Sequence, residues 1–391
     1  MKRILSVLVL GLSVLGTLQA QELTNFAFWG QKPIISPEIQ NDSVTFRLKA
    51  DYATIVKLSG SWMPNPWTGT IDMQRGENNV WSVKVPLPAP EIYTYNFVVD
   101  GVAVNDPQNV LVQRDGTRYL PMLLVPGERT ENYGEANQHG TVSHPWYHSN
   151  ILGMDRRLTV YTPYGYENNP KKKYPVLYLL HGAGGDEEAW ISMGRTAQIL
   201  DNLIEKGLAE PMIVVMPNGN ANQAAARTLN IPEKQMPNRW DREAFEKMSE
   251  AERDLLMNGY VRSLCTEIVP FIEKNFRAIA KPASRAISGL SMGGGHTISA
   301  SILYPEMFDY ICPLSAAGSA TPEQIATLKK AGVKLYFLAC GNTDFLFQGA
   351  EEMHAKLTDQ GLEHEYFVSD GGHVWSNWRL YLNTFAQKLF K

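Results

Sequence analysis

Ser291 lies in the sequence GLSMG, with one glycine two residues before it and another two residues after it. This G-x-S-x-G pattern is typical of a tight turn between a strand and a helix, where residues without a Cβ let the two elements approach. The apolar run RAI before the turn predicts the strand, and GGGHTISASILY after it predicts the helix. Such a turn would expose the Ser291 hydroxyl as a nucleophile. The alternative is a glycine-rich turn with an incidental serine.

A serine hydroxyl needs a histidine to accept its proton and a carboxylate to hold the tautomer of that histidine. Asp344 follows the apolar run KLYFLAC and His373 follows HEYFV, so each is expected on a loop at the carboxyl end of a strand. Ligand sites of open α/β sheets lie at this edge. Two rival acids are less suitable, because Asp370 shares a loop with His373 and Asp309 precedes a strand. We therefore expect Ser291, Asp344 and His373 to form a catalytic triad.

An ester-cleaving triad also needs two backbone donors for the oxyanion of its tetrahedral intermediate. The amide of Met292, directly after the nucleophile, is expected to be one. The glycine-rich stretch LLHGAGGDEEAW is expected to supply the other, from Ala183 or alternatively Gly182. His181 in this stretch is expected to hold the turn rather than to act as a base. The histidine spacing matches no metal-binding motif, and we expect neither a metal nor another cofactor.

The residues that would carry this chemistry belong to the second of two patterns in the chain. From about residue 149, short apolar runs alternate with segments of helical periodicity, as in 260–276. Alternation of this kind predicts an α/β fold with a doubly wound, mostly parallel sheet over residues 149–391. The expected strands are PVLYLL, PMIVVM, RAIS, YICPLS, KLYFLA and HEYFV.

Residues 21–126 follow a different pattern, with apolar residues at every second position as in Trp81, Val83 and Val85. The dipeptide Asp100-Gly101 between two apolar runs predicts a two-residue hairpin turn. Several short strands of this kind indicate a smaller immunoglobulin-like β-sandwich. Residues 127–148, rich in Gly, Asn, Glu and His, are expected to be a linker.

Composition and the N-terminus narrow the cellular context. The chain has 391 residues, 44% of them hydrophobic, and a net charge of -4 without a basic patch, which speaks against nucleic-acid binding. Residues 1–20 have a basic start, an apolar stretch and a small residue at the end, which predicts a signal peptide and an exported protein. A membrane anchor is the alternative, but the apolar stretch is shorter than the ~20 residues of a membrane span.

Three cysteines are too few for a disulfide framework in an exported chain. Cys265 recurs with apolar residues at helical spacing and is expected to be a core thiol. Buried free thiols are also expected at Cys312 and Cys340, with a single bridge between these two as the alternative.

Four motifs in order, LLHGAGGDEEAW, SGLSMGG, GNTDF and GGHVWSNW, give the second part of the chain a family resemblance. With the lead-in SNILGMDRRLTVYTPYGY, it resembles the feruloyl and acetyl esterases of carbohydrate esterase family 1, the esterase D-like branch of the α/β-hydrolases. The resemblance covers about residues 140–391. The front part, through GSWMPNPWTGTIDMQRGENNVWSVKVPLPAPEIYTYNFVVDG, resembles the family 48 carbohydrate-binding modules.

The resemblance implies a serine esterase that acts on feruloylated or acetylated plant polysaccharides or oligosaccharides, such as arabinoxylan. It leaves the acyl group open: we expect feruloyl, with an acetyl xylan esterase or a catechol-siderophore esterase as the alternatives. A non-catalytic glycan-binding protein on a hydrolase scaffold is the alternative from another class. Because all three triad residues are present, an enzyme is the better expectation.

Substrate contacts are expected from aromatic residues near the triad. The polar segment 218–249 has no periodicity and would be either a wall of the acyl pocket or a tolerated insertion. In the first case Trp240 and Phe245 would stack on an aromatic acyl group. Gly182 and Trp375 are further candidates, although Trp375 and Trp378 could instead pack in the core.

The role of the front part is open at this level. Trp62 and Trp67 would either stack on sugar rings or fill the sandwich core. Because the triad and both oxyanion donors lie in residues 140–391, we expect that fragment alone to act on small soluble esters. An unfolded fragment would show that the two parts share a core.

Overall fold

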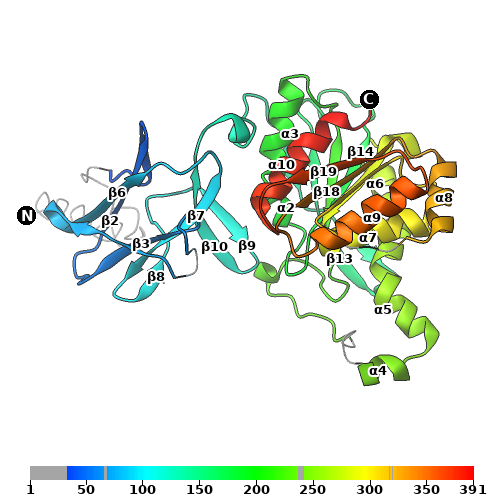
Figure 1. The fold of residues 1–391 in the computed structure, drawn as a ribbon, viewed down its shortest axis with the longest axis horizontal. Helices are drawn as coiled ribbons and strands as arrows, with labels where there is room; N and C mark the ends of the chain where they lie inside the picture. Colours follow the sequence, from blue (N-terminus) through cyan, green and yellow to red (C-terminus); the bar gives the residue numbers. More distant parts are fainter. Residues whose placement is uncertain (1–32, 66–67, 237–241, 317, 319) are drawn as a thin grey trace, which may run out of the picture.

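The computed structural model describes residues 33–65, 68–236, 242–316, 318 and 320–391. A β-sandwich at one end of the molecule is joined side by side to a larger α/β part (Figure 1). The predicted signal peptide and both Trp67 and Trp240 lie outside the described residues. Within the described residues, no helix is long and apolar enough to cross a membrane.

The front part is a sandwich of two antiparallel sheets, as expected. Asp100 and Gly101 form the predicted two-residue hairpin turn between β7 and β8, with φ angles of 48° and 89°. One sheet has the strand order β1-β2-β6-β5, and the other has β4-β3-β7-β10-β9 with β8 beside β7. The strands are β1 (Glu38–Gln40), β2 (Ser43–Lys49), β3 (Val56–Gly60), β4 (Ile71–Asp72), β5 (Gln74–Arg75), β6 (Val80–Pro86), β7 (Ile92–Val99), β8 (Val102–Val104), β9 (Val112–Asp115) and β10 (Arg118–Leu124).

Trp62 belongs to the core of this sandwich rather than to a flat sugar platform. Its ring stacks on Phe46 with the ring centroids 5.6 Å apart, and Tyr93 packs edge-on against it. The indole face that stacks on Phe46 is therefore not free for a sugar, and the partly buried ring packs against the sandwich core. The expectation that aromatic residues fill this small sandwich describes Trp62 better than sugar stacking does.

The second part has the predicted α/β fold around one mixed sheet. Its strand order is β11-β13-β15-β14-β16-β17-β18-β19, with β12 beside β13. The strands from β15 to β19 run parallel, while β11, β12 and β15 pair antiparallel with β13. The strands are β11 (Thr141–Ser143), β12 (Trp146–Ser149), β13 (Met154–Thr162), β14 (Val176–Leu180), β15 (Ile213–Pro217), β16 (Arg285–Leu290), β17 (Tyr310–Leu314), β18 (Leu335–Gly341) and β19 (Glu365–Ser369).

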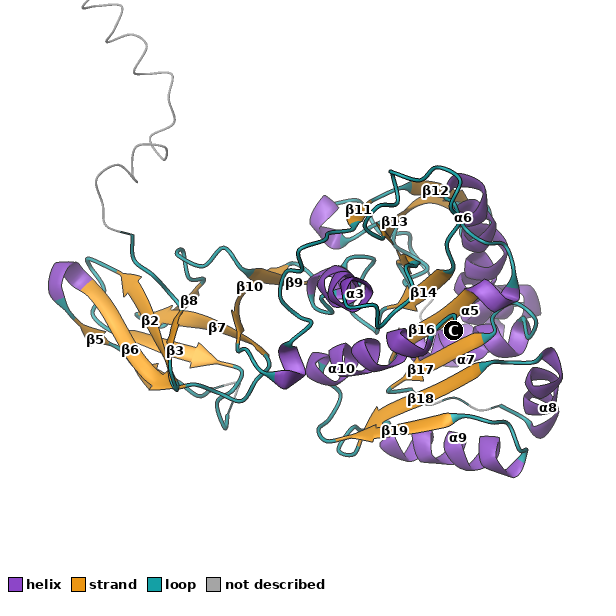
Figure 2. Cartoon of the chain, turned by 90° about the horizontal axis from the view of Figure 1, so that it is seen from above, coloured by secondary structure: helices purple, strands orange, loops and turns teal. Residues whose placement is uncertain are grey.

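Helices cover both faces of this sheet, as a doubly wound fold requires (Figure 2). On one face lie α2, α3 and α10, and on the other lie α5 to α9. The helices are α2 (Ala189–Ser192), α3 (Thr196–Glu205), α4 (Arg242–Lys247), α5 (Glu250–Ser263), α6 (Val269–Asn275), α7 (Met292–Leu303), α8 (Pro322–Ala331), α9 (Phe347–Asp359) and α10 (Trp375–Phe385).

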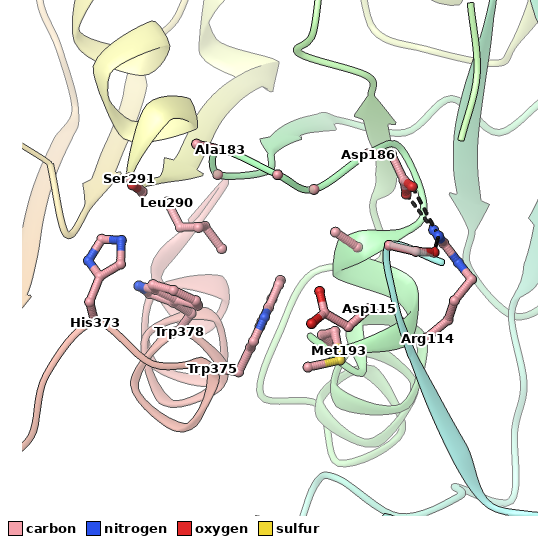
Figure 3. Close-up of a pocket in the computed structure, with 15 residues that line it drawn as sticks. Arg114, Asp115, Ala183, Asp186, Met193, Leu290, Ser291, His373, Trp375 and Trp378 are labelled. Carbon is pink, nitrogen blue, oxygen red and sulfur yellow. Dashed lines mark hydrogen bonds and ion pairs between the residues drawn. The ribbon is translucent and has the colours of Figure 1, made fainter. Parts of the chain in front are cut away.

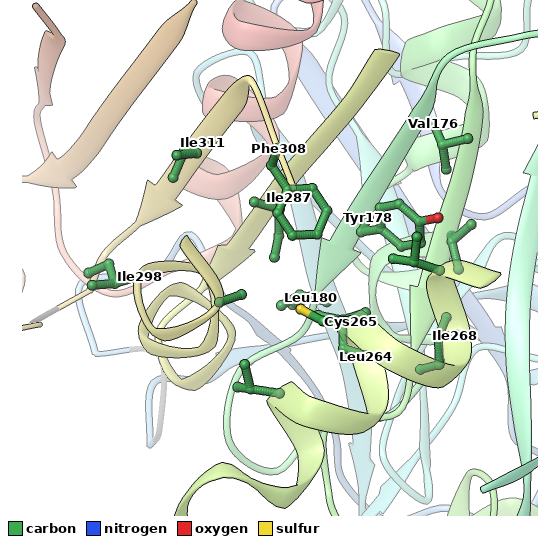
Figure 4. Close-up of a cluster of buried hydrophobic side chains, with 14 of the residues drawn as sticks. Val176, Tyr178, Leu180, Leu264, Cys265, Ile268, Ile287, Ile298, Phe308 and Ile311 are labelled. Atoms are coloured by element: carbon green, nitrogen blue, oxygen red, sulfur yellow. The ribbon is translucent and has the colours of Figure 1, made fainter. Parts of the chain in front are cut away.

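All three cysteines are buried free thiols, so the alternative of a Cys312–Cys340 bridge is not found. Cys265 lies in the apolar layer between the α5–α6 region and the sheet, near Leu180 and Ile287 (Figure 4). Burial raises the pKa of the Cys265 thiol to about 12. A thiol in this environment stays protonated and unreactive at neutral pH.

Residues 127–148 form more structure than the expected linker. β11 and β12 both lie in this stretch and pair with β13 of the main sheet. Tyr133 is fully buried in the core beside α3 and α10. The polar composition of residues 127–148 indicated a linker without regular structure. A short segment can nevertheless pair with the edge of a sheet through backbone hydrogen bonds alone, which requires no apolar pattern in its sequence.

The two parts of the chain share a hydrophobic core. Ile92 of β7 and Met122 of β10 belong to the same buried cluster as Tyr381 of α10. Beside this cluster, the buried Glu91 and Arg379 form an ion pair across the boundary, with Nη2 and Oε1 2.8 Å apart. The sandwich is therefore packed onto the α/β part and is not a separate module on a tether.

Candidate active site

Ser291 occupies the turn between β16 and α7, as its sequence pattern predicts. Its backbone has φ 54° and ψ −115°, a conformation that a residue with a Cβ adopts only under strain. The Ser291 amide donates to Leu314 O at 2.9 Å, and its carbonyl accepts from Gly295 N at 2.9 Å. These bonds to a neighbouring strand and to the following helix hold the strained turn in place.

The two glycines of the pattern are required by close packing. A Cβ added at Gly289 would lie 2.5 Å from the carbonyl carbon of Gly293, and one added at Gly293 would lie 2.5 Å from Leu180 O. Real Cβ atoms do not approach backbone atoms so closely. Helix α7 can therefore start directly against β14 and β16 only when both positions are glycine.

Asp344 and His373 meet at the carboxyl edge of the sheet, on the loops after β18 and β19. His373 Nδ1 lies 3.0 Å from Oδ1 and 2.9 Å from Oδ2 of Asp344. A ring nitrogen next to a carboxylate carries the proton and donates, which leaves Nε2 as the acceptor. Asp344 Oδ1 also accepts from Leu346 N at 2.9 Å, so the buried carboxylate is held on two sides.

The rival acids are placed elsewhere. Asp370 accepts from Asn342 Nδ2 at 2.9 Å in an exposed pair at the start of the histidine loop. Asp309 precedes β17, at the amino edge of the sheet.

Asn342 is one of the residues that the sequence did not single out. Its Oδ1 accepts from Gly371 N at 3.1 Å and joins the loop of Asp344 to the loop of His373.

A wall of aromatic rings supports the histidine. Trp378 packs edge-on against His373, with ring centroids 5.0 Å apart, and donates its Nε1 hydrogen to Ser315 Oγ at 3.0 Å. Trp375 packs edge-on against Trp378 at 5.1 Å. Trp378 is buried and thus follows the core-packing interpretation, although it also borders, together with Trp375, the cavity beside Ser291.

The glycine-rich loop after β14 passes directly beside the nucleophile. A Cβ added at Gly182 would lie 2.4 Å from Cδ1 of Leu290 and 3.3 Å from the Cβ of Ser291. A residue larger than glycine at this position would therefore have to displace the Leu290 side chain. Gly182 and Ala183 line the same cavity as Ser291. Met292 opens α7, and its amide is therefore among the helical N–H groups that have no acceptor within the helix. Both candidate oxyanion donors border the place where an ester carbonyl would meet Ser291.

His181 holds this loop and lies outside the triad. Its Nε2 accepts from Gly219 N at 2.7 Å, so the proton is on Nδ1, which donates to Gly182 O at 2.7 Å. Burial lowers the pKa of His181, and the neutral ring keeps both hydrogen bonds.

Glu187, which the sequence did not single out, joins the loop after β14 to the segment after β15. This fully buried carboxylate accepts from Arg157 Nε at 2.7 Å, Asn218 Nδ2 at 3.0 Å and Ala226 N at 2.8 Å. The motif DEEAW places three acidic residues in a row and does not reveal which of them turns inward. Asp186 and Glu187 are both buried, and their tertiary partners, Arg114 for Asp186 and Arg157 for Glu187, account for this.

Ser291 and His373 border one cavity of about 210 Å³. Figure 3 shows their side chains at one end, with the indole of Trp375 along the cavity. The apolar lining includes Leu290, Met193 and Ala189. We refer to this cavity as the slot: Ser291 lies at one end of it, and its lining combines apolar side chains with the charged residues Arg114, Asp115 and Asp186.

Among its described residues, segment 218–249 contributes nothing to the lining of this cavity. The first part of the segment packs on the β12–β13 edge, where Ala224 O accepts from Arg157 N at 2.8 Å and Lys234 Nζ donates to Leu152 O at 2.8 Å. Phe245 lies on α4, at the tip of an arm that extends away from the sheet (Figure 1), with the Arg253 guanidinium 5.8 Å from its ring centroid. The expected acyl-pocket role of Phe245 is therefore not seen.

The opposite wall of the cavity comes from the sandwich, which the sequence did not reveal. Arg114, Asp115 and Gly116, at the tip of the β9–β10 hairpin, line it together with Ser291. The buried Arg114 guanidinium pairs with both oxygens of Asp186, which follows the glycine-rich loop, and its Nε lies 3.0 Å from Glu188 Oε2. The hairpin is thus tied to the loop that carries Ala183.

Comparison with known proteins gives this arrangement a family. The Esterase family model matches residues 149–389. An endo-1,4-beta-xylanase/feruloyl esterase from Xylanibacter ruminicola is 32% identical over 332 residues, which are 83% of this chain and 42% of that protein. The chain thus spans less than half the length of this curated relative.

Two solved structures show the same fold. A ferulic acid esterase is 28% identical, with a TM-score of 0.50 over 65% of this chain and 100% of its own. The enterobactin esterase of Shigella flexneri, at 17% identity, reaches a TM-score of 0.60 over 93% of this chain and 97% of its own. The second match covers both the sandwich and the α/β part.

Proposed function

We propose that this chain, which belongs to the Esterase family and is a carboxylic ester hydrolase, cleaves hydroxycinnamoyl esters, feruloyl above all, on plant cell-wall polysaccharides such as arabinoxylan. The relative from Xylanibacter ruminicola carries feruloyl esterase in its name, and so does one of the solved structures in the form ferulic acid esterase. The observation that carries the proposal for this chain is the slot beside Ser291, walled by Trp375, Leu290 and Met193.

In the proposed reaction Ser291 Oγ attacks the ester carbonyl carbon while His373 Nε2 takes its proton. The oxyanion of the tetrahedral intermediate accepts from the amides of Met292 and Ala183. Collapse of the intermediate breaks the bond to the sugar oxygen, and His373 returns the proton to that oxygen. Water then attacks the acyl carbon while His373 Nε2 takes a proton from it. Collapse of this second intermediate breaks the bond to Ser291 Oγ, His373 returns the proton to Oγ, and the carboxylic acid is released. Asp344 keeps Nδ1 protonated throughout and stabilises the imidazolium.

The shape of the slot favours a flat aromatic acid over acetate. An aromatic acyl group buries apolar surface against Trp375 and Leu290, at about 25 cal/mol per Å² of area removed from water. An acetyl group leaves most of a cavity of about 210 Å³ filled with water. The binding energy that distinguishes the two acids therefore comes from the length of the slot and not from the triad.

The test compares two pairs of esters with matched leaving groups, methyl ferulate with methyl acetate and p-nitrophenyl ferulate with p-nitrophenyl acetate, and adds acetylated xylan, as substrates of the purified full chain. We expect kcat/KM for methyl ferulate to be well above that for acetyl esters with a comparable leaving group. Ser291→Ala should abolish hydrolysis of every ester and leave the circular-dichroism spectrum unchanged. Equal kcat/KM for both acyl groups would favour an acetyl esterase, and turnover by the Ser291→Ala variant would refute the mechanism.

Export to the periplasm or outside of the cell, with cleavage after residue 20, completes the proposal. Glycan binding by the sandwich is also proposed, on its resemblance to carbohydrate-binding modules. N-terminal sequencing of the mature protein tests the first point. Affinity electrophoresis of the Ser291→Ala variant in arabinoxylan tests the second.

A further inference from the structure

The tip of the β9–β10 hairpin brings one carboxylate of the sandwich into the catalytic cavity. Asp115 ends β9, and Gly116, with φ 59°, begins the turn to β10. Both residues line the cavity that contains Ser291 and His373. In the view of Figure 3 the Asp115 side chain lies near Trp375 and Met193, with Trp375 between it and the Ser291–His373 end of the cavity.

The acidic residues of this lining differ in what they can still bind. The Asp186 carboxylate is buried and taken up by the bidentate pair with Arg114. The Asp115 carboxylate is 41% exposed and accepts from Arg118 Nη2 at its Oδ2, 2.6 Å away. A carboxylate has room for about four hydrogen bonds, so this single exposed pair leaves most of the acceptor capacity of Asp115 free.

The position of the hairpin is fixed independently of Asp115. Arg114 N donates to Ser192 Oγ of α2, and Gln113 Nε2 donates to Met193 O at 3.5 Å. Together with the buried Arg114–Asp186 pair, these contacts hold the backbone on both sides of the tip. A side chain on a fixed backbone at the end of a slot is well placed to discriminate between substrates.

We propose that Asp115 recognises the phenolic hydroxyl of the hydroxycinnamoyl group, so that the sandwich supplies a specificity-determining residue of the acyl pocket. This inference rests on the proposed function. With the ester carbonyl at Ser291 and the ring against Trp375, the ring hydroxyl at the far end of the acid points to the hairpin. The hydroxyl donates and the carboxylate accepts. A cinnamoyl group without the ring hydroxyl would remove water from the Asp115 carboxylate and offer it no hydrogen-bond donor in return. Sites that bind a substrate hydroxyl reject analogues lacking it for this reason.

The test uses two esters that differ only in this hydroxyl, methyl 4-hydroxycinnamate and methyl cinnamate. For the wild-type full chain we expect a kcat/KM ratio of about 10 to 100 in favour of the hydroxylated ester, the range for a hydrogen bond to a charged group. Asp115→Ala should bring the ratio close to one, mainly through loss on the hydroxylated ester. Asp115→Asn, which keeps an acceptor oxygen without the charge, should give an intermediate ratio.

Arg118→Met is the matched control, because it removes the ion pair on the same hairpin and keeps the carboxylate. Its ratio should stay close to that of the wild type. A wild-type ratio near one, or an unchanged ratio in both Asp115 variants, would overturn the inference while leaving a feruloyl preference over acetyl intact. A wild type without preference for hydroxycinnamoyl over acetyl esters would instead remove the proposed function and this inference with it.

Discussion

Replacement of Arg114 by Met tests whether the sandwich holds the loop of Ala183, the proposed oxyanion donor. Arg114 and Asp186 are both buried, with 6% and 4% of their surfaces exposed, and they form a bidentate pair. Met fills a similar volume and removes the charge, so the Asp186 carboxylate is left buried without its cation. Breaking a buried ion pair from one side costs about 3–5 kcal/mol.

The lower end of that range is the better expectation here. Asp186 Oδ1 still accepts from Glu188 N at 3.0 Å, and the Glu188 carboxylate keeps its contact with Arg157. We therefore expect Arg114→Met to lower the free energy of unfolding by about 3 kcal/mol. Because Asp186 follows the loop of Ala183, kcat should also fall for feruloyl and acetyl esters alike, by up to about 100-fold, the lower bound for loss of one oxyanion donor.

Urea unfolding followed by circular dichroism measures the first effect, and steady-state kinetics on both esters measures the second. The control is Arg118→Met, which removes an exposed ion pair 2.6 Å long from the same hairpin and should cost less than about 1 kcal/mol. A double-mutant cycle of Arg114→Met with Asp186→Asn isolates the pair itself. Unchanged stability and kcat in Arg114→Met, or equal losses in the Arg114 and Arg118 variants, would refute the reasoning.

Three further predictions concern the triad, the domain boundary and pH. Asp344→Asn should lower kcat by about 10⁴ through the wrong histidine tautomer, while Asp370→Asn stays near wild type in the same assay; the reverse pattern would reassign the acid. Residues 140–391 alone should be poorly folded and inactive even on p-nitrophenyl acetate, contrary to the expectation from sequence, because removal of the sandwich exposes the shared core. A stable, active fragment would disprove this. Burial lowers the pKa of His181 below its ordinary 6.5. Below about pH 6.5 the unfolded chain therefore binds a proton at this histidine that the folded chain does not bind. The free energy of unfolding should consequently fall as the pH decreases. His181→Gln should flatten that dependence, measured by urea unfolding at pH 7 and pH 5, and an equally steep slope in the variant would assign it to other groups.

The sequence by itself determined the parts of this protein that depend on local pattern. Alternating apolar runs and helical segments gave the α/β fold, and period-two alternation gave the sandwich. The GLSMG turn follows from steric necessity, because no residue larger than glycine fits at Gly289 or Gly293. The order of Ser291, Asp344 and His373 along the chain, each after a strand, places them at one edge of a parallel sheet before any contact is known.

Contacts between distant segments were decided only by the tertiary structure. Nothing in the local sequence of Arg114 distinguishes a buried ion-pair partner of Asp186, 72 residues away, from a surface arginine. Of the two interpretations of the polar segment 218–249, a pocket wall or a tolerated insertion, the structure favours the second for the described residues, and the hairpin of the sandwich lines the cavity beside Ser291 instead. Charge pairing and shape complementarity between the sandwich and the α/β part set this arrangement, and neither leaves a periodic signal in the sequence.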